Sequence, residues 1–229
     1  MTSSPSIIHP WVVDDFYAAP DRVRAHALRM PFRQVPGFAG WRTPPHHARG
    51  IRSRLARALG VSVVGWSTDR KNLAFGNGSF FKGFSVGPYA DPVAVHVDTP
   101  TDYLTTVVDL TPNPPRDSGT SFWQHRETGL VAAPTPADSR RLGATVAELA
   151  ARLNREGQLP EKWIEVARVE NRCNRAVAFP SGVLHSATRH FGRTLNGGRL
   201  YQSFRFAYSG ALGKGPVGGA DCYSPTGVV

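Results

Sequence analysis

Apolar residues along this chain fall into short runs of β-branched and aromatic side chains, separated by polar turns. These runs are bounded by Gly, Pro, Asn or Asp, a pattern that predicts many short β-strands. Apolar residues at helical spacing predict helices from Pro20 to Met30, over residues 50–59 and over residues 137–156. Strands are expected at 11–16, 72–76, 79–86, 94–97, 103–110, 119–124, 163–170, 176–179 and 199–208.

This order of elements predicts a mainly β core with flanking helices, closed as a barrel or sandwich so that few strand edges stay open. The 229 residues suit one domain. We expect it to span residues 1–229, with an N-terminal strand and helices in 11–60, the barrel core in 61–208 and a loose tail over 209–229.

Composition narrows the class of protein. Hydrophobic residues make up 41% of the chain and charged residues 19%, as in a globular protein. No apolar run approaches the ~18–20 residues of a membrane span, and the N-terminus does not resemble a secretory signal. The chain has two cysteines, Cys173 and Cys222, and no CxxC pair. We therefore expect free thiols, no disulfide framework, no cysteine zinc site and a cytoplasmic location.

The net charge of +10, with a pI of about 10.3, favours anionic partners. The basic residues are mostly arginines that are scattered along the whole sequence, with no run of five or more. We interpret them as a solvated surface and do not expect nucleic acid or a membrane as partner. The sequence leaves the oligomeric state open.

Three residues form a candidate metal site. His96 and Asp98 stand two apart in a predicted strand and so point to the same face. His185 follows an apolar strand and a Pro-Ser-Gly turn. Two histidines and one carboxylate on adjacent strands can occupy one face of an iron(II) ion and leave the opposite face open. A strand-end histidine held by its neighbouring carboxylate stays an alternative, and His125 is a rival third ligand.

The strand that starts at Arg199 carries a second candidate site. Arg199, Tyr201, Ser203 and Arg205 are expected on one face of this strand, and Leu200, Gln202, Phe204 and Phe206 on the other. A guanidinium with hydroxyl groups on the same face suits a buried carboxylate, which accepts a bidentate pair from arginine.

This ordered set resembles the Fe(II)/2-oxoglutarate-dependent oxygenases. The resemblance rests on His96-x-Asp98, the distal His185 and Arg199 on the next strand, and it spans roughly residues 11–208. Within that superfamily, the stretch from His96 to Gln202 is similar to a small, poorly described bacterial branch. The fold that the resemblance implies is a double-stranded β-helix, also called a jelly roll.

The resemblance also implies roles. His96, Asp98 and His185 would bind Fe(II) as the catalytic centre. Arg199 would pair with the distal carboxylate of the cosubstrate 2-oxoglutarate, supported by Ser203 or Tyr201. The wide spacing between His185 and Arg199 leaves Arg193 and Arg205 open as anchors.

The implied reaction couples oxidative decarboxylation of 2-oxoglutarate by dioxygen to hydroxylation of an unactivated C–H bond. Its substrate would be a small molecule, an amino acid or a peptide in biosynthetic tailoring. Halogenating members carry a small residue where this chain has Asp98, so the resemblance implies a hydroxylase. A nucleic-acid demethylase of the same superfamily and a cupin-like metal-binding barrel without oxygen chemistry remain alternatives. Substrate contacts are expected from residues 31–50, 111–118 and 125–136.

Overall fold

Two antiparallel β-sheets form the core of the protein in the computed structural model, which describes residues 8–36, 40–69, 71, 75–87, 90–194 and 197–210. The larger sheet has the order β1 (Trp11–Val13), β9 (Ala176–Pro180), β6 (Leu104–Asp109), β11 (Arg199–Ser209), β5 (Ser79–Gly83), β3 (Trp41–Arg42) and β2 (Arg33–Gln34), and β4 (Ser62–Gly65) pairs with the end of β11. The smaller sheet has the order β10 (His185–Ala187), β7 (Thr120–His125) and β8 (Trp163–Val169).

The chain winds between these two sheets as a jelly roll. From β5 it crosses to a bridge between His96 and His185 at the edge of the smaller sheet, and then returns to β6. It continues through β7 and β8 in the smaller sheet, β9 in the larger, β10 in the smaller and β11 in the larger. Phe122 of the smaller sheet packs edge-on against Phe179 of the larger one. The predicted double-stranded β-helix is therefore confirmed, as is the mainly β class.

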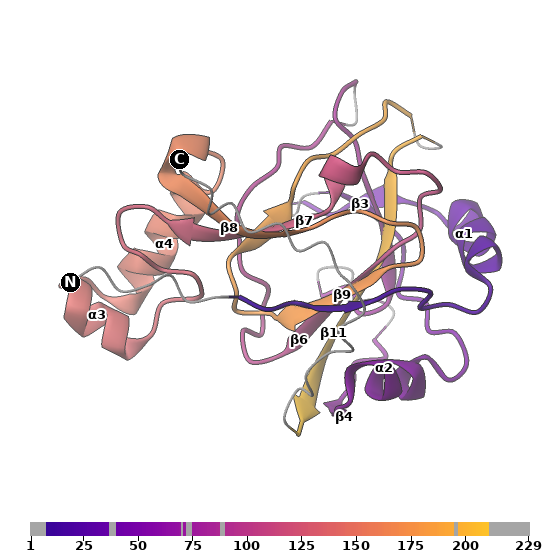
Figure 1. Cartoon of the computed structure of the whole chain (residues 1–229), viewed down its shortest axis with the longest axis horizontal. Helices are drawn as coiled ribbons and strands as arrows, with labels where there is room; N and C mark the ends of the chain where they lie inside the picture. Colours follow the sequence, from indigo (N-terminus) through magenta and orange to yellow (C-terminus); the bar gives the residue numbers. More distant parts are fainter. Residues whose placement is uncertain are drawn as a thin grey trace, which may run out of the picture.

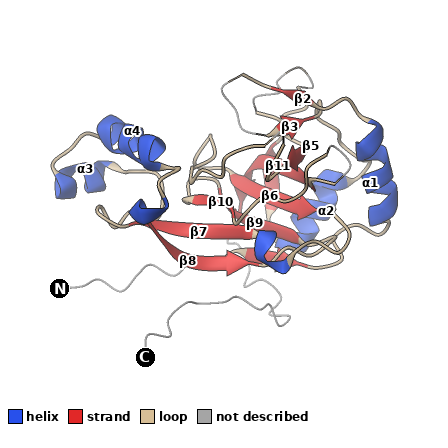
Figure 2. Ribbon diagram, turned by 90° about the horizontal axis from the view of Figure 1, so that it is seen from above, coloured by secondary structure: helices blue, strands red, loops and turns tan. Residues whose placement is uncertain are grey.

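Alternation along β11 gives the larger sheet its two faces. Leu200, Phe204 and Phe206 are fully buried on one face, in a cluster with Ala27 and Leu55 of the two helices that cover it. These helices are α1 (Pro20–Arg29) and α2 (Ile51–Leu59), close to the bounds that the sequence predicts. Figures 1 and 2 show α1 and α2 at one end of the molecule and the other two helices at the opposite end.

The helix predicted over residues 137–156 is wrong as a single element, because two helices occupy that range. They are α3 (Pro136–Leu142) and α4 (Val146–Glu156). Gly143 ends α3 in the left-handed conformation, with a φ of 66°. Thr145 then starts α4 with a capping box, in which Glu148 bonds back to the Thr145 backbone. The apolar spacing of residues 142–153 hides this break.

The shortest strands were missed. Residues 31–50, expected as a loop, include β2 and β3, and β4 was not predicted either. These strands have two to four residues, too few to show a periodicity, and only pairing with longer strands makes them visible. The strand expected at 94–97 is reduced to the single bridge at His96. Two 3₁₀ turns, Arg116–Ser118 and Pro160–Lys162, complete the elements.

Some expectations fall outside the described residues. They concern most of the strand expected at 72–76, the thiol of Cys222 and the tail beyond residue 210. Cys173 has a free thiol, as predicted. None of the helices in the described ranges is both long and apolar enough to cross a membrane.

The direction in which one substitution changes the free energy of unfolding tests the break between α3 and α4. In a continuous helix, Gly143→Ala would raise the free energy of unfolding by about 1 kcal/mol, because alanine favours helix interiors. At a left-handed C-cap, the added Cβ strains the backbone instead, and nothing lies within 4 Å to complicate the change. We expect Gly143→Ala to lower the unfolding free energy in urea by about 1 kcal/mol. Equal or increased stability would show that the helix is continuous.

Candidate active site

A cavity of about 380 Å³ opens between the two sheets, on the face of the larger sheet turned away from α1 and α2. Its wall includes Arg199, Tyr201, Ser203 and Arg205, the four residues of β11 that the sequence places on one face, and this prediction is confirmed. His185 of β10 in the smaller sheet also lines the cavity, with His96 and Asp98 from the segment that bridges to His185. Both sets of candidate residues therefore line one cavity.

The structure brings His96, Asp98 and His185 together. One potential ligand atom from each lies within 4.8 Å of the other two. His96 and His185 exchange two backbone hydrogen bonds of 3.0 Å, which fixes the two rings side by side with centroids 4.5 Å apart. Nε2 of His185 lies 3.6 Å from Oδ2 of Asp98.

Hydrogen bonds to the backbone set the tautomer of both histidines. Nδ1 of His185 lies 2.8 Å from the carbonyl oxygen of Val183, and Nδ1 of His96 lies 2.9 Å from that of Ala94. A carbonyl oxygen only accepts, so each Nδ1 carries the proton and donates it. Each Nε2 then keeps its lone pair for a ligand bond, the arrangement usual for metal-bound imidazoles. Burial, followed by the charge of His96, lowers the pKa of His185 to about 4 and keeps this ring neutral.

Asp98 is held by polar neighbours. Its Oδ2 accepts a 2.7 Å hydrogen bond from the hydroxyl of Thr105, which is buried and also bonds Ser181. Its Oδ1 lies 3.5 Å from a guanidinium nitrogen of Arg205. Burial acts to raise the pKa of Asp98, but the charges of His185, Arg205 and His96 outweigh it and hold the pKa below its usual value. Asp98 is therefore an oriented carboxylate.

Arg199 is buried, with 2% of its surface exposed, and it has a carboxylate partner that the sequence analysis did not foresee. Oδ1 of Asp109, itself 1% exposed, lies 3.1 Å from Nε and 3.0 Å from Nη2. Nη1 donates to the carbonyl oxygen of Gly119 at 2.8 Å. A guanidinium has five N–H donors. Three are directed at these two partners, which leaves two for a ligand in the cavity.

Aromatic rings make the wall beside Arg199. The ring of Tyr201 stacks on that of Phe81, with the two ring centres 5.2 Å apart. The guanidinium of Arg42 also lies over the Phe81 ring, 4.8 Å from its centre. Burial raises the pKa of Tyr201, so its hydroxyl keeps its proton and can donate. Phe81 is thus both a core residue and part of the cavity wall.

The other candidates differ in position. Arg205 lies at the Asp98 end of β11, six residues from Arg199, or about 20 Å of strand. Arg193 is exposed and does not line the cavity. Both ring nitrogens of His125 form hydrogen bonds, Nδ1 with the hydroxyl of Thr128 at 2.8 Å and Nε2 with the carboxylate of Glu156 at 2.7 Å. This rival ligand therefore belongs to a separate group of residues.

Sequence reasoning missed several residues of the cavity. The lining also includes Pro92, Val93, Ala94, Val97, Thr99 and Ala187, whereas the expected segments 111–118 and 125–136 contribute no lining residue. His190, which the sequence does not single out, also lines the cavity, and its buried Nδ1 has no hydrogen-bond partner among the described residues. Its ring lies over Gly83, where a Cβ would come within 2.2 Å of Nδ1. The only sequence signal for the space that the His190 ring occupies was Gly83, two residues after Phe81, whose side chain lines the cavity.

Comparisons with known proteins give a partial match to a family model and distant similarities to solved structures. Residues 93–200 match a model described as a family of unknown function, DUF6445. No curated protein matches. Among solved structures, HygX from Streptomyces hygroscopicus with nickel, 2-oxoglutarate and hygromycin B bound is 13% identical, with a TM-score of 0.48 over 87% of this chain and 83% of that one. HygX with nickel and 2-oxoglutarate bound gives a TM-score of 0.44 at the same identity and coverage.

The buried His190 makes the stability of the protein depend on pH. Burial, with a further contribution from Arg199, lowers the pKa of His190 to about 4, against about 6.5 in an unfolded chain. Between these values only the unfolded state takes up the proton, so stability falls as the pH drops from 6.5 to 4. We expect His190→Gln to reduce this slope by up to about 1.4 kcal/mol per pH unit in urea unfolding of the metal-free protein. Identical slopes for both proteins would contradict the burial of a neutral His190.

Proposed function

We propose that this chain is an Fe(II)/2-oxoglutarate-dependent oxygenase that hydroxylates a small molecule, an amino acid or a peptide. The observation that carries the proposal is the convergence of two imidazoles and one carboxylate within 4.8 Å in a jelly-roll cavity. A buried guanidinium in the wall of the same cavity adds a place for an anionic cosubstrate. A simple metal-binding barrel has no need of the second feature.

The donor set fits Fe(II). Neutral imidazole nitrogens and a carboxylate oxygen are ligands suited to this ion, and a two-histidine, one-carboxylate set leaves coordination positions open. His96 and His185 would bind through Nε2, because Nδ1 of each donates to a carbonyl oxygen. Asp98 would bind through its carboxylate while Thr105 keeps it oriented. When bound, the metal would supply the activation of dioxygen, driven by decarboxylation of 2-oxoglutarate.

Arg199 is the proposed anchor of 2-oxoglutarate. Its two remaining N–H groups can form a charge-assisted pair with the distal carboxylate. Asp109 and the carbonyl oxygen of Gly119 accept hydrogen bonds from the guanidinium and fix its position. The cosubstrate would therefore bind a donor that is already oriented. Tyr201 and Ser203 lie on the same face of β11 and would donate hydroxyl hydrogen bonds to the same carboxylate. Burial between two sheets excludes bulk water from this pair.

Two features bear on the reaction outcome. Asp98 occupies the position where halogenating relatives of the resembled superfamily have a small residue, so we propose hydroxylation. The cavity of about 380 Å³ lies in the range of small-molecule sites, which favours a small substrate or one side chain of a peptide. The segment 92–99, with Gly40 and Arg42, forms the wall that would select the substrate.

Removal of one ligand tests the metal site. We expect His185→Ala to weaken Fe(II) binding by at least about 100-fold in anaerobic calorimetry. The loss of a metal ligand lowers affinity more than the loss of a hydrogen bond that only orients a ligand. Thr105→Val keeps the shape and removes the hydroxyl that bonds Asp98 and Ser181, so a smaller loss of about 10- to 100-fold is expected. His190→Gln, in the same cavity but away from the three ligands, is the matched control and should bind Fe(II) like the parent. Unchanged binding in a folded His185→Ala protein would contradict the triad.

A second test concerns the cosubstrate, with succinate formation as the readout. Truncation of Arg199 alone would leave Asp109 buried and unpaired, so the double variant Arg199→Met/Asp109→Leu is preferred. We expect it to fold, to bind Fe(II) and to raise the KM for 2-oxoglutarate by roughly two orders of magnitude or more, since a buried charge pair is lost. Arg193→Ala, on the surface, is the control.

The competing outcomes are distinct. A large effect from Arg205→Ala together with a normal KM in the Arg199 variant would assign the anchor to the Asp98 end of β11. Absence of succinate from the unaltered protein with Fe(II), 2-oxoglutarate and a broad substrate set would favour the cupin-like binding barrel.

A further inference from the structure

The positive charge of this chain is concentrated in one segment. Residues 20–71 contain eleven Arg and Lys against two Asp, a net charge of +9. The rest of the chain has sixteen against fifteen, a net charge of +1. The arginines look scattered in the sequence because acidic residues accompany them everywhere except in this segment. The segment builds α1, β2, β3, α2 and β4, all on one side of the larger sheet or at its edge.

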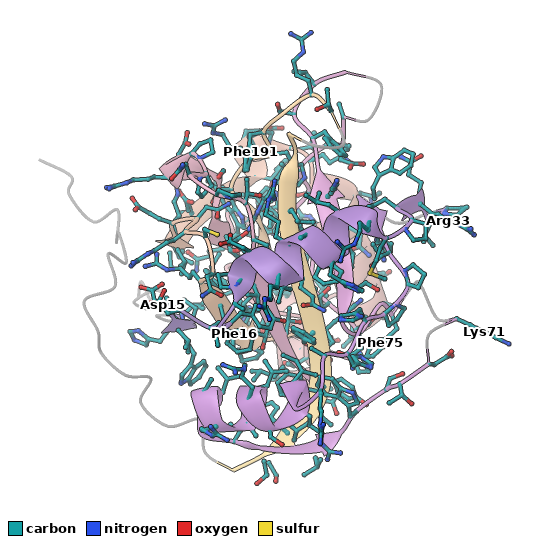
Figure 3. All side chains as sticks on the ribbon, turned by 90° about the vertical axis from the view of Figure 1, so that its right-hand side faces the viewer. Asp15, Phe16, Arg33, Lys71, Phe75 and Phe191 are labelled. Atoms are coloured by element: carbon teal, nitrogen blue, oxygen red, sulfur yellow. The ribbon has the colours of Figure 1, made fainter. Side chains whose placement is uncertain are left out.

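The fold places six of these charges on one surface, whereas Arg42 of the same segment is buried and lines the cavity. Both helices bury their apolar stripes against the larger sheet, through Ala27 of α1 and through Ile51, Leu55 and Leu59 of α2, so their polar sides face outward. Figure 3 looks onto this side, with α1 and α2 in front and the labelled Arg33 and Lys71 projecting at its edge. We call this surface the arginine face and define it by six exposed side chains: Arg22, Arg29, Arg33, Arg49, Arg54 and Arg57.

These six side chains lie close together in the sequence and lack carboxylate partners, whereas the other arginines without such a partner, among them Arg116, Arg140, Arg155 and Arg193, are spread over the rest of the chain. No salt bridge within the described ranges joins any of them to a carboxylate. Elsewhere, at least nine Arg and Lys side chains form such pairs, from Arg141 to Arg205. The acidic residues of the segment are Asp21 and Asp69, and Asp15 lines the groove on this side. The uncompensated charge of the protein therefore lies here.

A groove gives the arginine face a shape. It has a volume of about 390 Å³ and lies between α2 and the segment that follows β1. Arg49, Arg54 and Arg57 line it, together with Ser53, the acidic Asp15 and a few apolar residues of β1 and α2 and between them. Arg54 is braced by a 2.9 Å hydrogen bond to the carbonyl oxygen of Phe16. The highest density of positive charge thus surrounds a hollow.

We propose that the arginine face binds the sugar-phosphate backbone of a nucleic acid, independently of the chemistry in the cavity. The face offers charge and almost no apolar anchor. Among the described residues, its exposed large hydrophobic side chains are Leu28 of α1, at 36%, and Val64 of β4, at 59%. Protein interfaces depend on buried aromatic and apolar anchors, and a membrane-surface helix inserts an apolar face. Nucleic acid binds by phosphate neutralisation alone, and arginine forks match phosphate oxygens.

The geometry also fits contact with the nucleic-acid backbone without recognition of individual bases. The two helices are about 15 Å and 13 Å long, and each can follow several phosphates, which are spaced 3.4 Å apart along one strand. Exposed aromatic rings that could stack on bases do not occur among the described side chains of the face. The cavity opens on the opposite face of the larger sheet, so a nucleic acid held here is a docking partner and not the oxidised substrate.

The test compares two variants of equal net charge. Arg22→Gln/Arg29→Gln/Arg49→Gln/Arg57→Gln removes four charges from the arginine face. Arg116→Gln/Arg140→Gln/Arg155→Gln/Arg193→Gln removes four exposed charges elsewhere. Binding is measured by fluorescence anisotropy of a labelled 20-base-pair DNA duplex and a 20-nucleotide single-stranded RNA, at salt concentrations from 50 to 200 mM. The tighter ligand identifies the kind of nucleic acid.

The face variant should raise Kd about tenfold or more at 50 mM salt and flatten the salt slope by about 3 to 4 for the duplex, since each phosphate contact contributes about 0.9. The control variant should change Kd less than about threefold. Equal weakening by both variants, or no binding to either nucleic acid at 50 mM salt, would overturn the proposal. Tighter binding to poly-L-glutamate or to phosphatidylserine vesicles would assign the face to an acidic protein or to a membrane instead. Fe(II) binding should be the same in all three proteins.

Discussion

The alternation of side chains along β11 is the constraint on which the rest of the structure depends. This strand is eleven residues long and pairs with β5, β6 and β4, so it lies in the middle of the larger sheet. Its even-numbered residues from Leu200 to Phe206 anchor the helices, apart from Gln202, which bonds Tyr17 and the backbone. Its odd-numbered residues face the cavity. A slip of one residue would bury two arginines under the helices and turn phenylalanines toward the metal ligands.

Buried charge in the cavity is tolerated because each group is compensated. Arg199 and Asp109 form a pair that is almost fully enclosed, and the carbonyl oxygen of Gly119 takes a third N–H. Gly119 has no room for a side chain, since a Cβ would lie 1.8 Å from the carbonyl oxygen of Val169. Such a pair adds little net stability, because desolvation offsets most of the attraction. Its consequence is orientation, since it holds a guanidinium at one end of the cavity and leaves two donors for a ligand.

The two faces of the larger sheet thus handle charge in opposite ways. Inside the cavity, arginines meet carboxylates at short range, and the local environment keeps His185 and His190 neutral through lowered pKa values caused by burial. On the helical side, the arginines of the arginine face form no salt bridge with a carboxylate among the described residues, and Arg54 bonds only a backbone carbonyl oxygen. A protein gains little stability from such an excess of like charge. This contrast is the physical reason to look for a polyanion outside the cavity and for a small carboxylate inside it.

The sequence by itself determined the strand-rich class and the helices from Pro20 and from Ile51, and it predicted the set His96, Asp98, His185 and Arg199, whose members line one cavity. Local periodicity and spacing carry that information, because residues two apart in a strand share a face wherever the strand lies. Tertiary structure alone decided that Asp109 neutralises Arg199, that His190 enters the cavity over Gly83, and that residues 92–99 form its wall. It also decided that scattered arginines share one surface. These relations join residues up to about a hundred positions apart, and only the pairing of strands and the packing of helices bring such residues together.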